Sequence, residues 1–257
     1  MSKRSLFLDS AREHGQPVGA GFAPAPTVEQ LLGLPPVKPP PADKPYLDNR
    51  LGVSDLSALV PMEAAITAST IPQALARMRN RTSWGLKELR LIHATIFRPI
   101  YPWAGKIRQS DIAKNGDVFE SFSVIPKRMS QLIDRLEQTY ADGQNLFEGL
   151  KQKSQDQVAD TLAHLYHGVC WIHPFREGNG RTMRTFCAAI ARQTGFDLQW
   201  NRLDFATKNA FDKTCSKPFS LTENPLAPYF RQVIVQLEAK PVEPTPRRMD
   251  NVVQLKV

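Results

Sequence analysis

Residues 173–184 read HPFREGNGRTMR and separate two stretches of helical periodicity. Pro174 disfavours the α-helical conformation at the residue before it, so a helix is predicted to end at His173 and a loop to begin. The Gly-Asn-Gly triplet 178–180 stands just ahead of the next helix, which is predicted to start near Arg181. This helix–loop–helix is the organising feature of the chain.

Amphipathic helices are predicted on both sides of this segment, because apolar residues recur there at intervals of three and four. The predicted helical stretches are residues 55–78 (with Pro61 near one start and Pro72 opening a second segment), 86–97, 125–140, 155–171, 182–194 and 226–237. Residues 107–122, IRQSDIAKNGDVFESF, differ: Asn115-Gly116 between short strand-like stretches indicates a β-hairpin. We therefore expect an all-α fold, a compact helical bundle with one small β-hairpin.

Proline marks the ends of this unit. Nine of the 21 prolines fall in residues 1–50 and three in residues 241–257. We predict a proline-rich, partly disordered N-terminal extension over residues 1–48, a folded domain over 49–239, and a flexible basic C-terminal tail over 240–257.

Composition and charge restrict the class of protein to which this chain can belong. The 257 residues contain 33 Lys+Arg against 25 Asp+Glu, a formal charge of +8, and 42% hydrophobic residues. No apolar run approaches the roughly 20 residues that span a bilayer, and the N-terminus has no signal-peptide core. The three cysteines are expected to be reduced thiols, two of them in the core of a cytoplasmic protein. The charge alone admits nucleic acid, an acidic protein or a polyphosphate as partner.

The loop 173–184 concentrates the residue types of a phosphate site. Glycines at a helix N-terminus let backbone N–H groups approach an anion, and the helix dipole favours negative charge there. Arg181 and Arg184 lie three residues apart on the first turns of the predicted helix. Mg²⁺, which accompanies polyphosphates, prefers oxygen ligands, and Glu177 supplies a carboxylate. His173 is then placed to accept a proton from a hydroxyl.

A zinc site is a rival interpretation of HLYHGVCWIH, residues 164–173, in which His164, His167, Cys170 and His173 are spaced by threes. Positions three apart drift around a continuous helix, so the four side chains cannot all converge on one ion. His164 and His167 are instead expected to be partly exposed helix residues.

The hairpin region is aromatic and basic. Tyr101 and Trp103 are predicted to pack in the core near its base rather than contact a target. Four cations surround it, and they predict either a solvated face or a surface that recognises an acidic target: Lys106, Arg108, Lys114 and Lys127.

The segment HPFREGNGRTMR resembles the HPFx(D/E)GNGRxxR signature of Fic-domain proteins at every specified position. FRPIYPWAGKIR, residues 97–108, resembles the stretch before the Fic flap. NRLGVSDL, residues 49–56, is similar to the N-terminal entry of toxin-type members.

This resemblance implies a Fic fold with the hairpin as a flap over the active site, and protein adenylyltransferase activity. AMP would pass from ATP to a Ser, Thr or Tyr hydroxyl of a target protein, with Mg²⁺ as cofactor. The implied roles are His173 as general base, Glu177 as metal ligand, Gly178, Asn179, Gly180, Arg181 and Arg184 as the phosphate site, and Phe175 as the structural anchor of the motif. The flap residues expected to dock an extended target segment by strand addition are Ile107, Ile112, Asn115, Gly116, Val118 and Phe119.

The residue at position 180 bears on the reaction class. Family members that transfer phosphate, such as Doc, carry a lysine at the matching position, whereas this sequence has Gly180. The resemblance therefore implies AMP transfer rather than phosphorylation.

The same resemblance also implies how the activity is regulated and which protein is its target. The inhibitory pattern [S/T]xxxE[G/N] is absent, since the residues four before Glu148, Glu177 and Glu223 are Gln144, His173 and Phe219. A separate small antitoxin, whose Glu would meet Arg184, is the expected inhibitor. A bacterial toxin acting on DNA gyrase or topoisomerase IV is the first expectation. The alternatives are a secreted effector that modifies host small GTPases and a non-catalytic nucleotide-binding module. No membrane or direct nucleic-acid partner is expected.

Overall fold

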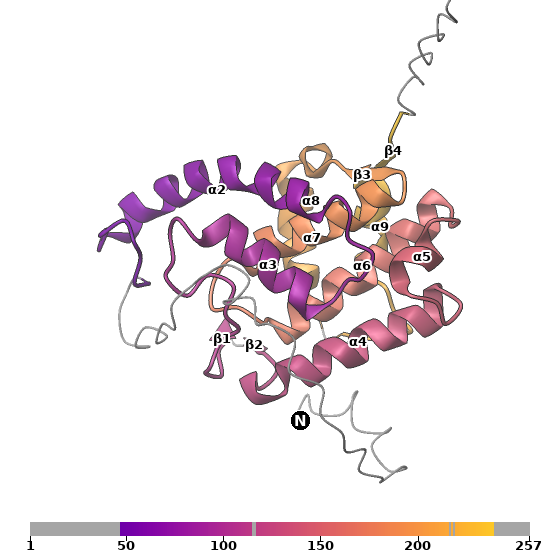
Figure 1. Ribbon diagram of the computed structural model, residues 1–257, viewed down its shortest axis with the longest axis horizontal. Helices are drawn as coiled ribbons and strands as arrows, with labels where there is room; N and C mark the ends of the chain where they lie inside the picture. Colours follow the sequence, from indigo (N-terminus) through magenta and orange to yellow (C-terminus); the bar gives the residue numbers. More distant parts are fainter. Residues whose placement is uncertain (1–46, 115–116, 216, 218, 239–257) are drawn as a thin grey trace, which may run out of the picture.

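The structure, a computed structural model, describes residues 47–114, 117–215, 217 and 219–238 (Figure 1). Its first helix, α2, spans Leu56–Met78, and the Asp55 side chain caps it by accepting a hydrogen bond from the Ser57 N–H. Pro61 and Pro72 both lie inside this one helix, so the predicted break into two segments is wrong. Packing of α2 on α3 outweighs the local cost of the prolines.

The core of the bundle is α3 (Leu86–Phe97), α6 (Gln155–Ile172) and α7 (Asn179–Gln193), which pack against one another. In Figure 1 they lie between α2 on one side and α4 on the other. The bounds of α3 agree with the prediction, and α6 begins at a capping box in which the side chains of Ser154 and Gln157 each accept a backbone N–H of the other. The end of α6 and the start of α7 carry the motif residues of the predicted active site.

Shorter elements complete the bundle. α4 (Ile125–Tyr140) has the predicted bounds and follows a 3₁₀ turn, η1 (Phe122–Val124). α5 (Leu146–Leu150), the 3₁₀ turn η2 (Trp200–Arg202) and α8 (Phe205–Cys215) lie outside the predicted helical stretches.

The C-terminal stretch 226–237, predicted as one helix, is divided. α9 covers Ala227–Val233 only, and the chain continues as β4 (Ile234–Gln236), antiparallel to β3 (Phe196–Leu198). Gly195, in the left-handed region at φ 92°, turns the chain out of α7 into β3. The β-branched Ile234 and Val235 then pair with β3, a contact between distant segments that helical periodicity does not detect.

The predicted hairpin is present. β1 (Ala113–Lys114) pairs with β2 (Asp117–Val118) in antiparallel register, with Ala113 opposite Val118 and Lys114 opposite Asp117. Asn115 and Gly116, the predicted turn, lie outside the described residues. The expected class, an all-α fold with a small hairpin, is confirmed, with the β3–β4 pair added to it.

The burial of two histidines and of the cysteines differs from the prediction. His164 and His167 are buried, not partly exposed, because α6 lies in the middle of the bundle. Their Nε2 atoms hydrogen-bond to the carbonyl oxygens of Glu223 and Lys217, respectively. Of the cysteines only Cys187 is buried, so the expectation of two core thiols is wrong. None of the helices described is long and apolar enough to cross a membrane.

The buried histidines predict a pH-dependent stability. Burial lowers the pKa of His93 from 6.5 to about 3, and it lowers the pKa of His164 and His167 in the same direction. Between pH 3 and 6.5 the unfolded chain therefore binds a proton at His93 that the folded chain excludes, so stability falls as the pH is lowered. His93 alone should remove about 2 kcal/mol between pH 6.5 and 5. Urea unfolding at pH 7 and pH 5 measures this, and equal unfolding free energies would contradict it.

Candidate active site

His173 ends α6 as its C-cap, in the left-handed conformation with φ 50° and ψ 64°. Its backbone N–H donates to the Val169 carbonyl at 2.8 Å, and its Nδ1 lies 3.3 Å from the Cys170 carbonyl oxygen. A carbonyl only accepts, so the neutral ring with its proton on Nδ1 satisfies this contact and carries its lone pair on Nε2. In the neutral ring with this tautomer, Nε2 is the atom that can accept a proton.

The base of the hairpin packs against His173. The Phe119 ring stacks on the imidazole with ring centres 3.9 Å apart and planes 20° from parallel. The Phe119 N–H lies 3.4 Å from the Ile112 carbonyl oxygen, which extends the pairing of the two strands. Ile107 packs, partly buried, against the core, and Val118 pairs in β2. Of the described flap residues, Phe119 is therefore the one that the structure shows in contact with His173.

Arg108 joins the flap to the loop between α6 and α7. Its backbone N–H donates to the Pro174 carbonyl at 2.9 Å, and its Nε donates to the His173 carbonyl at 2.8 Å. The two terminal guanidinium nitrogens donate to the carbonyls of Ile172, Ser110 and Glu120. Its side chain is 1% exposed, so the expectation that Arg108 lies on a solvated basic face is wrong. The carbonyls around it, in segments that sequence spacing does not relate, explain the burial.

Buried side chains hold the loop between α6 and α7 in place. Phe175 is buried and stacks on His93, with ring centres 4.0 Å apart. The Asn179 side chain accepts the Phe175 N–H at 2.9 Å and donates to the Phe175 carbonyl at 2.7 Å. Phe175 therefore occupies the amide oxygen and one amide N–H of Asn179. His93 accepts the Gly105 N–H at Nδ1 and donates from Nε2 to the Glu177 carbonyl at 3.0 Å.

Gly178 is the N-cap of α7, with φ 79°. The first N–H groups of a helix have no intrahelical acceptor, so Asn179 and Gly180 direct backbone donors toward the space before α7. The Glu177 carboxylate already accepts the Gly178 N–H at 2.8 Å and is 49% exposed. The half-exposed Glu177 carboxylate fits as a ligand of Mg²⁺, because this ion keeps several water ligands and takes others from substrate phosphates.

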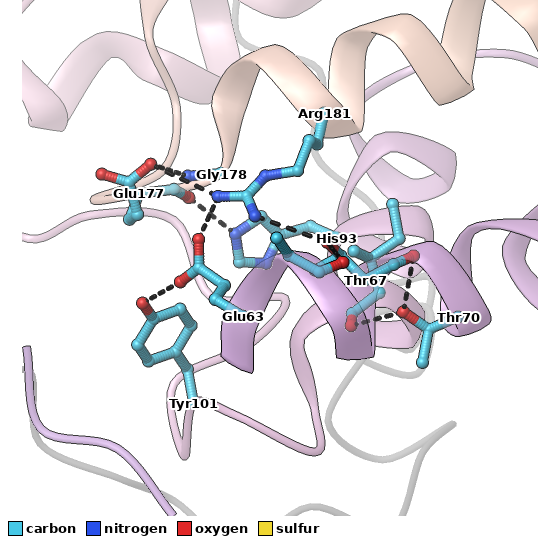
Figure 2. Close-up of polar contacts among 10 residues, drawn as sticks. Glu63, Thr67, Thr70, His93, Tyr101, Glu177, Gly178 and Arg181 are labelled. Atoms are coloured by element: carbon cyan, nitrogen blue, oxygen red, sulfur yellow. Dashed lines mark hydrogen bonds and ion pairs between the residues drawn. The ribbon is translucent and has the colours of Figure 1, made fainter. Parts of the chain in front are cut away.

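Arg181 is anchored to α2 (Figure 2). Its Nη2 donates to the Glu63 carboxylate, and its Nη1 lies 3.5 Å from the Thr67 hydroxyl. The guanidinium carbon stands 4.9 Å from the centre of the Phe97 ring, and Nη2 is 3.9 Å from Glu177. Arg181 thus sits between two carboxylates at the edge of the motif loop.

Arg184 is placed differently. Its guanidinium lies beside Gly180, where an added Cβ would be 3.5 Å from Nη1. No carboxylate of the residues that the structure describes lies within ion-pair distance of Arg184. Of the two motif arginines, Arg184 therefore keeps its charge unneutralised at the N-terminus of α7.

A Gly178→Ala variant is expected to be less stable by about 2–4 kcal/mol, because it combines a left-handed φ with overpacking. An ideal Cβ at this position would lie 2.4 Å from the buried Phe97 ring. Gly180→Ala is the matched control, since its Cβ meets only the end of Arg184 at ordinary contact distance. Chemical unfolding of both variants tests the difference, and equal stability would contradict it.

Sequence reasoning found the motif loop and missed its supports. Glu63, His93 and Arg108 were not predicted to contribute, and Tyr101 was predicted only as core, where its 2% exposure confirms it. Trp103 is buried beside it, as predicted. Glu63 lies 118 positions from Arg181 along the chain, so no local pattern could have paired them.

The described site combines a histidine at a helix end, a glycine-rich helix N-terminus with two arginines, and the base of a hairpin that packs on the histidine. Residues 83–191 match the model of the Fic/DOC family. The matched region contains α3, the hairpin, α6 and most of α7.

The sequence is similar to bacterial proteins named as adenylyltransferases. It is 28% identical over 170 residues to the protein adenylyltransferase VbhT of Bartonella schoenbuchensis, covering 63% of this chain and 34% of that protein. It is 32% identical over 120 residues to the probable protein adenylyltransferase Fic of Escherichia coli, covering 47% of this chain and 56% of that protein. The chain thus spans about a third and about half of these two relatives.

Solved Fic domains share the fold. The N-terminal Fic domain of a VirB-translocated effector of Bartonella quintana, with bound ADP, superposes with a TM-score of 0.63 at 19% identity, covering 77% of this chain and 94% of that one. The BepC effector of Bartonella tribocorum, with bound AMPPNP, gives 0.60 at 20% identity, covering 77% and 96%. The fold is therefore that of a Fic domain.

Proposed function

We propose that this chain is a protein adenylyltransferase that moves AMP from ATP to a Ser, Thr or Tyr hydroxyl of a target protein. The observation that carries the proposal is the short loop that joins His173, the C-cap of α6 with its Nδ1 against the Cys170 carbonyl, to Gly178, the N-cap of α7. The match to the Fic/DOC family model and the named relatives support it.

Each residue has a defined part in this reaction. His173 accepts the proton of the target hydroxyl, whose oxygen bonds to the α-phosphorus of ATP while the bond from that phosphorus to the leaving pyrophosphate breaks. The backbone N–H groups at the start of α7, with Arg181 and Arg184, bind the phosphates. Glu177 would hold Mg²⁺, which supplies charge neutralisation of the phosphates when bound. Phe119 and the described strands β1 and β2 present the target segment to His173.

Gly180 favours AMP transfer over phosphorylation. An added Cβ there would stand 3.5 Å from Arg184, so a lysine at this position would bring a second cation against that guanidinium. With glycine the space before α7 keeps room for the phosphate chain of a nucleotide.

Transfer from α-labelled and γ-labelled ATP distinguishes the reaction classes. The purified chain is incubated with Mg²⁺ and a bacterial lysate, and labelled proteins are separated and identified by mass spectrometry. Label from the α-position alone supports adenylylation. Label from the γ-position alone indicates phosphorylation, and no label from either position in both a bacterial and a eukaryotic lysate contradicts the proposal.

For the target we propose DNA gyrase and topoisomerase IV, on the toxin-like N-terminal resemblance of residues 49–56. The alternative is a secreted effector acting on host small GTPases; the similar Bartonella proteins of known structure are VirB-translocated effectors. Labelling a bacterial lysate and a eukaryotic lysate in parallel separates the two, since each predicts its modified protein in only one of them.

For regulation we propose a separate small antitoxin whose Glu pairs with Arg184. The support is that Arg184 has no carboxylate partner in the described part of the chain, whereas Arg181 has Glu63. Such an antitoxin should silence transfer until its Glu is replaced. A chain that is inactive alone and activated by replacing an internal Glu would contradict this.

A further inference from the structure

Glu63 on α2 joins two separate partners in the active site (Figure 2). One carboxylate oxygen accepts a hydrogen bond from Nη2 of Arg181, and the other accepts one from the Tyr101 hydroxyl. Burial and the Glu63 carboxylate both raise the pKa of Tyr101, so the phenol stays protonated and donates. Neither the motif nor its resemblance assigns Glu63 a role.

The geometry opposes a simple release of Arg181 from this pair. The Glu63 side chain is only 11% exposed, and Arg181 is the cation paired with it. A carboxylate left at such a position without its cation is strongly unfavourable. Tyr101 supplies a neutral hydrogen bond, which does not replace the lost charge.

Arg181 still has hydrogen-bond donors for an anion. Its two terminal nitrogens carry four N–H groups, of which Glu63 takes one and Thr67 approaches another. The Phe97 ring supports one face of the guanidinium. The contacts fix the plane of the group while leaving N–H groups for a phosphate.

We propose that Glu63 is a positioning residue, which holds the Arg181 guanidinium in place for the nucleotide phosphates and thereby ties α2 into the active site. The expected effect of Glu63 on nucleotide kinetics rests on the proposed function. The contact between Glu63 and Arg181 does not depend on it. The opposite possibility, that Glu63 competes with phosphate for Arg181, predicts effects of the opposite sign.

The test uses the full chain with Glu63→Gln, which keeps the shape of the side chain and removes its charge. Loss of a charge-assisted hydrogen bond that orients a ligand-binding group is expected to weaken binding of Mg²⁺–AMPPNP about tenfold. The KM for ATP should rise by a similar factor with kcat little changed, because the contact acts on nucleotide binding. Tighter AMPPNP binding or faster transfer would overturn the proposal and favour competition.

A second measurement is independent of activity. Side-chain nitrogen NMR of the nucleotide-free chain follows the Arg181 guanidinium, assigned with Arg181→Lys. Glu63→Gln should speed its rotation, and unchanged rotation overturns the proposal. If no AMP transfer is found at all, this measurement still decides the role of Glu63, so failure of the proposed function remains distinguishable.

Glu148→Gln is the matched control, since it removes a carboxylate from the exposed pair with Lys151 on α5. It should change neither Arg181 rotation nor AMPPNP affinity. If Glu63→Gln does not fold, Tyr101→Phe loosens Glu63 without removing its charge. Faster Arg181 rotation in that variant supports the proposal, and unchanged rotation overturns it.

Discussion

The His173→Asn variant is expected to transfer AMP about 10²–10⁴-fold more slowly than the unchanged chain, because it removes the group proposed to take the hydroxyl proton. Asparagine is chosen because His173 has φ 50°, a left-handed conformation that Asn adopts more readily than most residues. His173→Ala would add backbone strain to the loss of the base. Single-turnover transfer of α-label measures the effect.

Nucleotide affinity serves as the control for this variant. The proposed phosphate-binding groups belong to α7, beyond the loop, so His173→Asn should bind Mg²⁺–AMPPNP with nearly unchanged affinity. A transfer rate within tenfold of the unchanged chain would remove His173 as the general base. A large loss of AMPPNP binding would show that the substitution disturbs the loop.

The parts of the site that sequence reasoning found are local. Pro174 after His173, and glycines before a helical stretch, fix a helix end, a loop and a helix start within 12 residues. α6 ends there as predicted, whereas α7 begins at Asn179, two residues before the predicted start near Arg181, so Asn179 and Gly180 belong to the helix. α3 and α4 have their predicted bounds because their apolar stripes are regular. Here local propensity and tertiary packing agree.

The parts that it missed depend on contacts between distant segments. Two prolines in α2 predicted a break, yet packing on α3, with Thr70 donating to the Ile96 carbonyl at 2.9 Å, keeps the helix continuous. The β3–β4 pair joins segments on either side of α8 and α9. Glu63 carries no sequence signal that distinguishes it from a solvated helix residue, because only the fold brings Arg181 to it.

Arg108→Ala is expected to lower the unfolding free energy by about 3–5 kcal/mol, because several carbonyls at the heart of the site would lose a buried cationic donor. The carbonyls of Ile172 and His173 belong to the end of α6, and the carbonyls of Ser110 and Glu120 belong to the flap. Chemical unfolding measures the loss. Arg192→Ala is the control, since its pair with Asp197 is on the surface and should contribute less than about 1 kcal/mol.

Arg108→Lys separates charge from geometry. A lysine keeps the positive charge, but its ammonium cannot reach the carbonyls of both segments as the planar guanidinium does. We expect it to recover part of the stability while AMP transfer stays low, because the flap and the left-handed turn at His173 lose their common anchor. Transfer at the unchanged rate in a stable Arg108→Lys chain would mean that charge alone suffices. The flap and the base would then be positioned independently of Arg108, with the stacking of Phe119 on His173 as one contact between them.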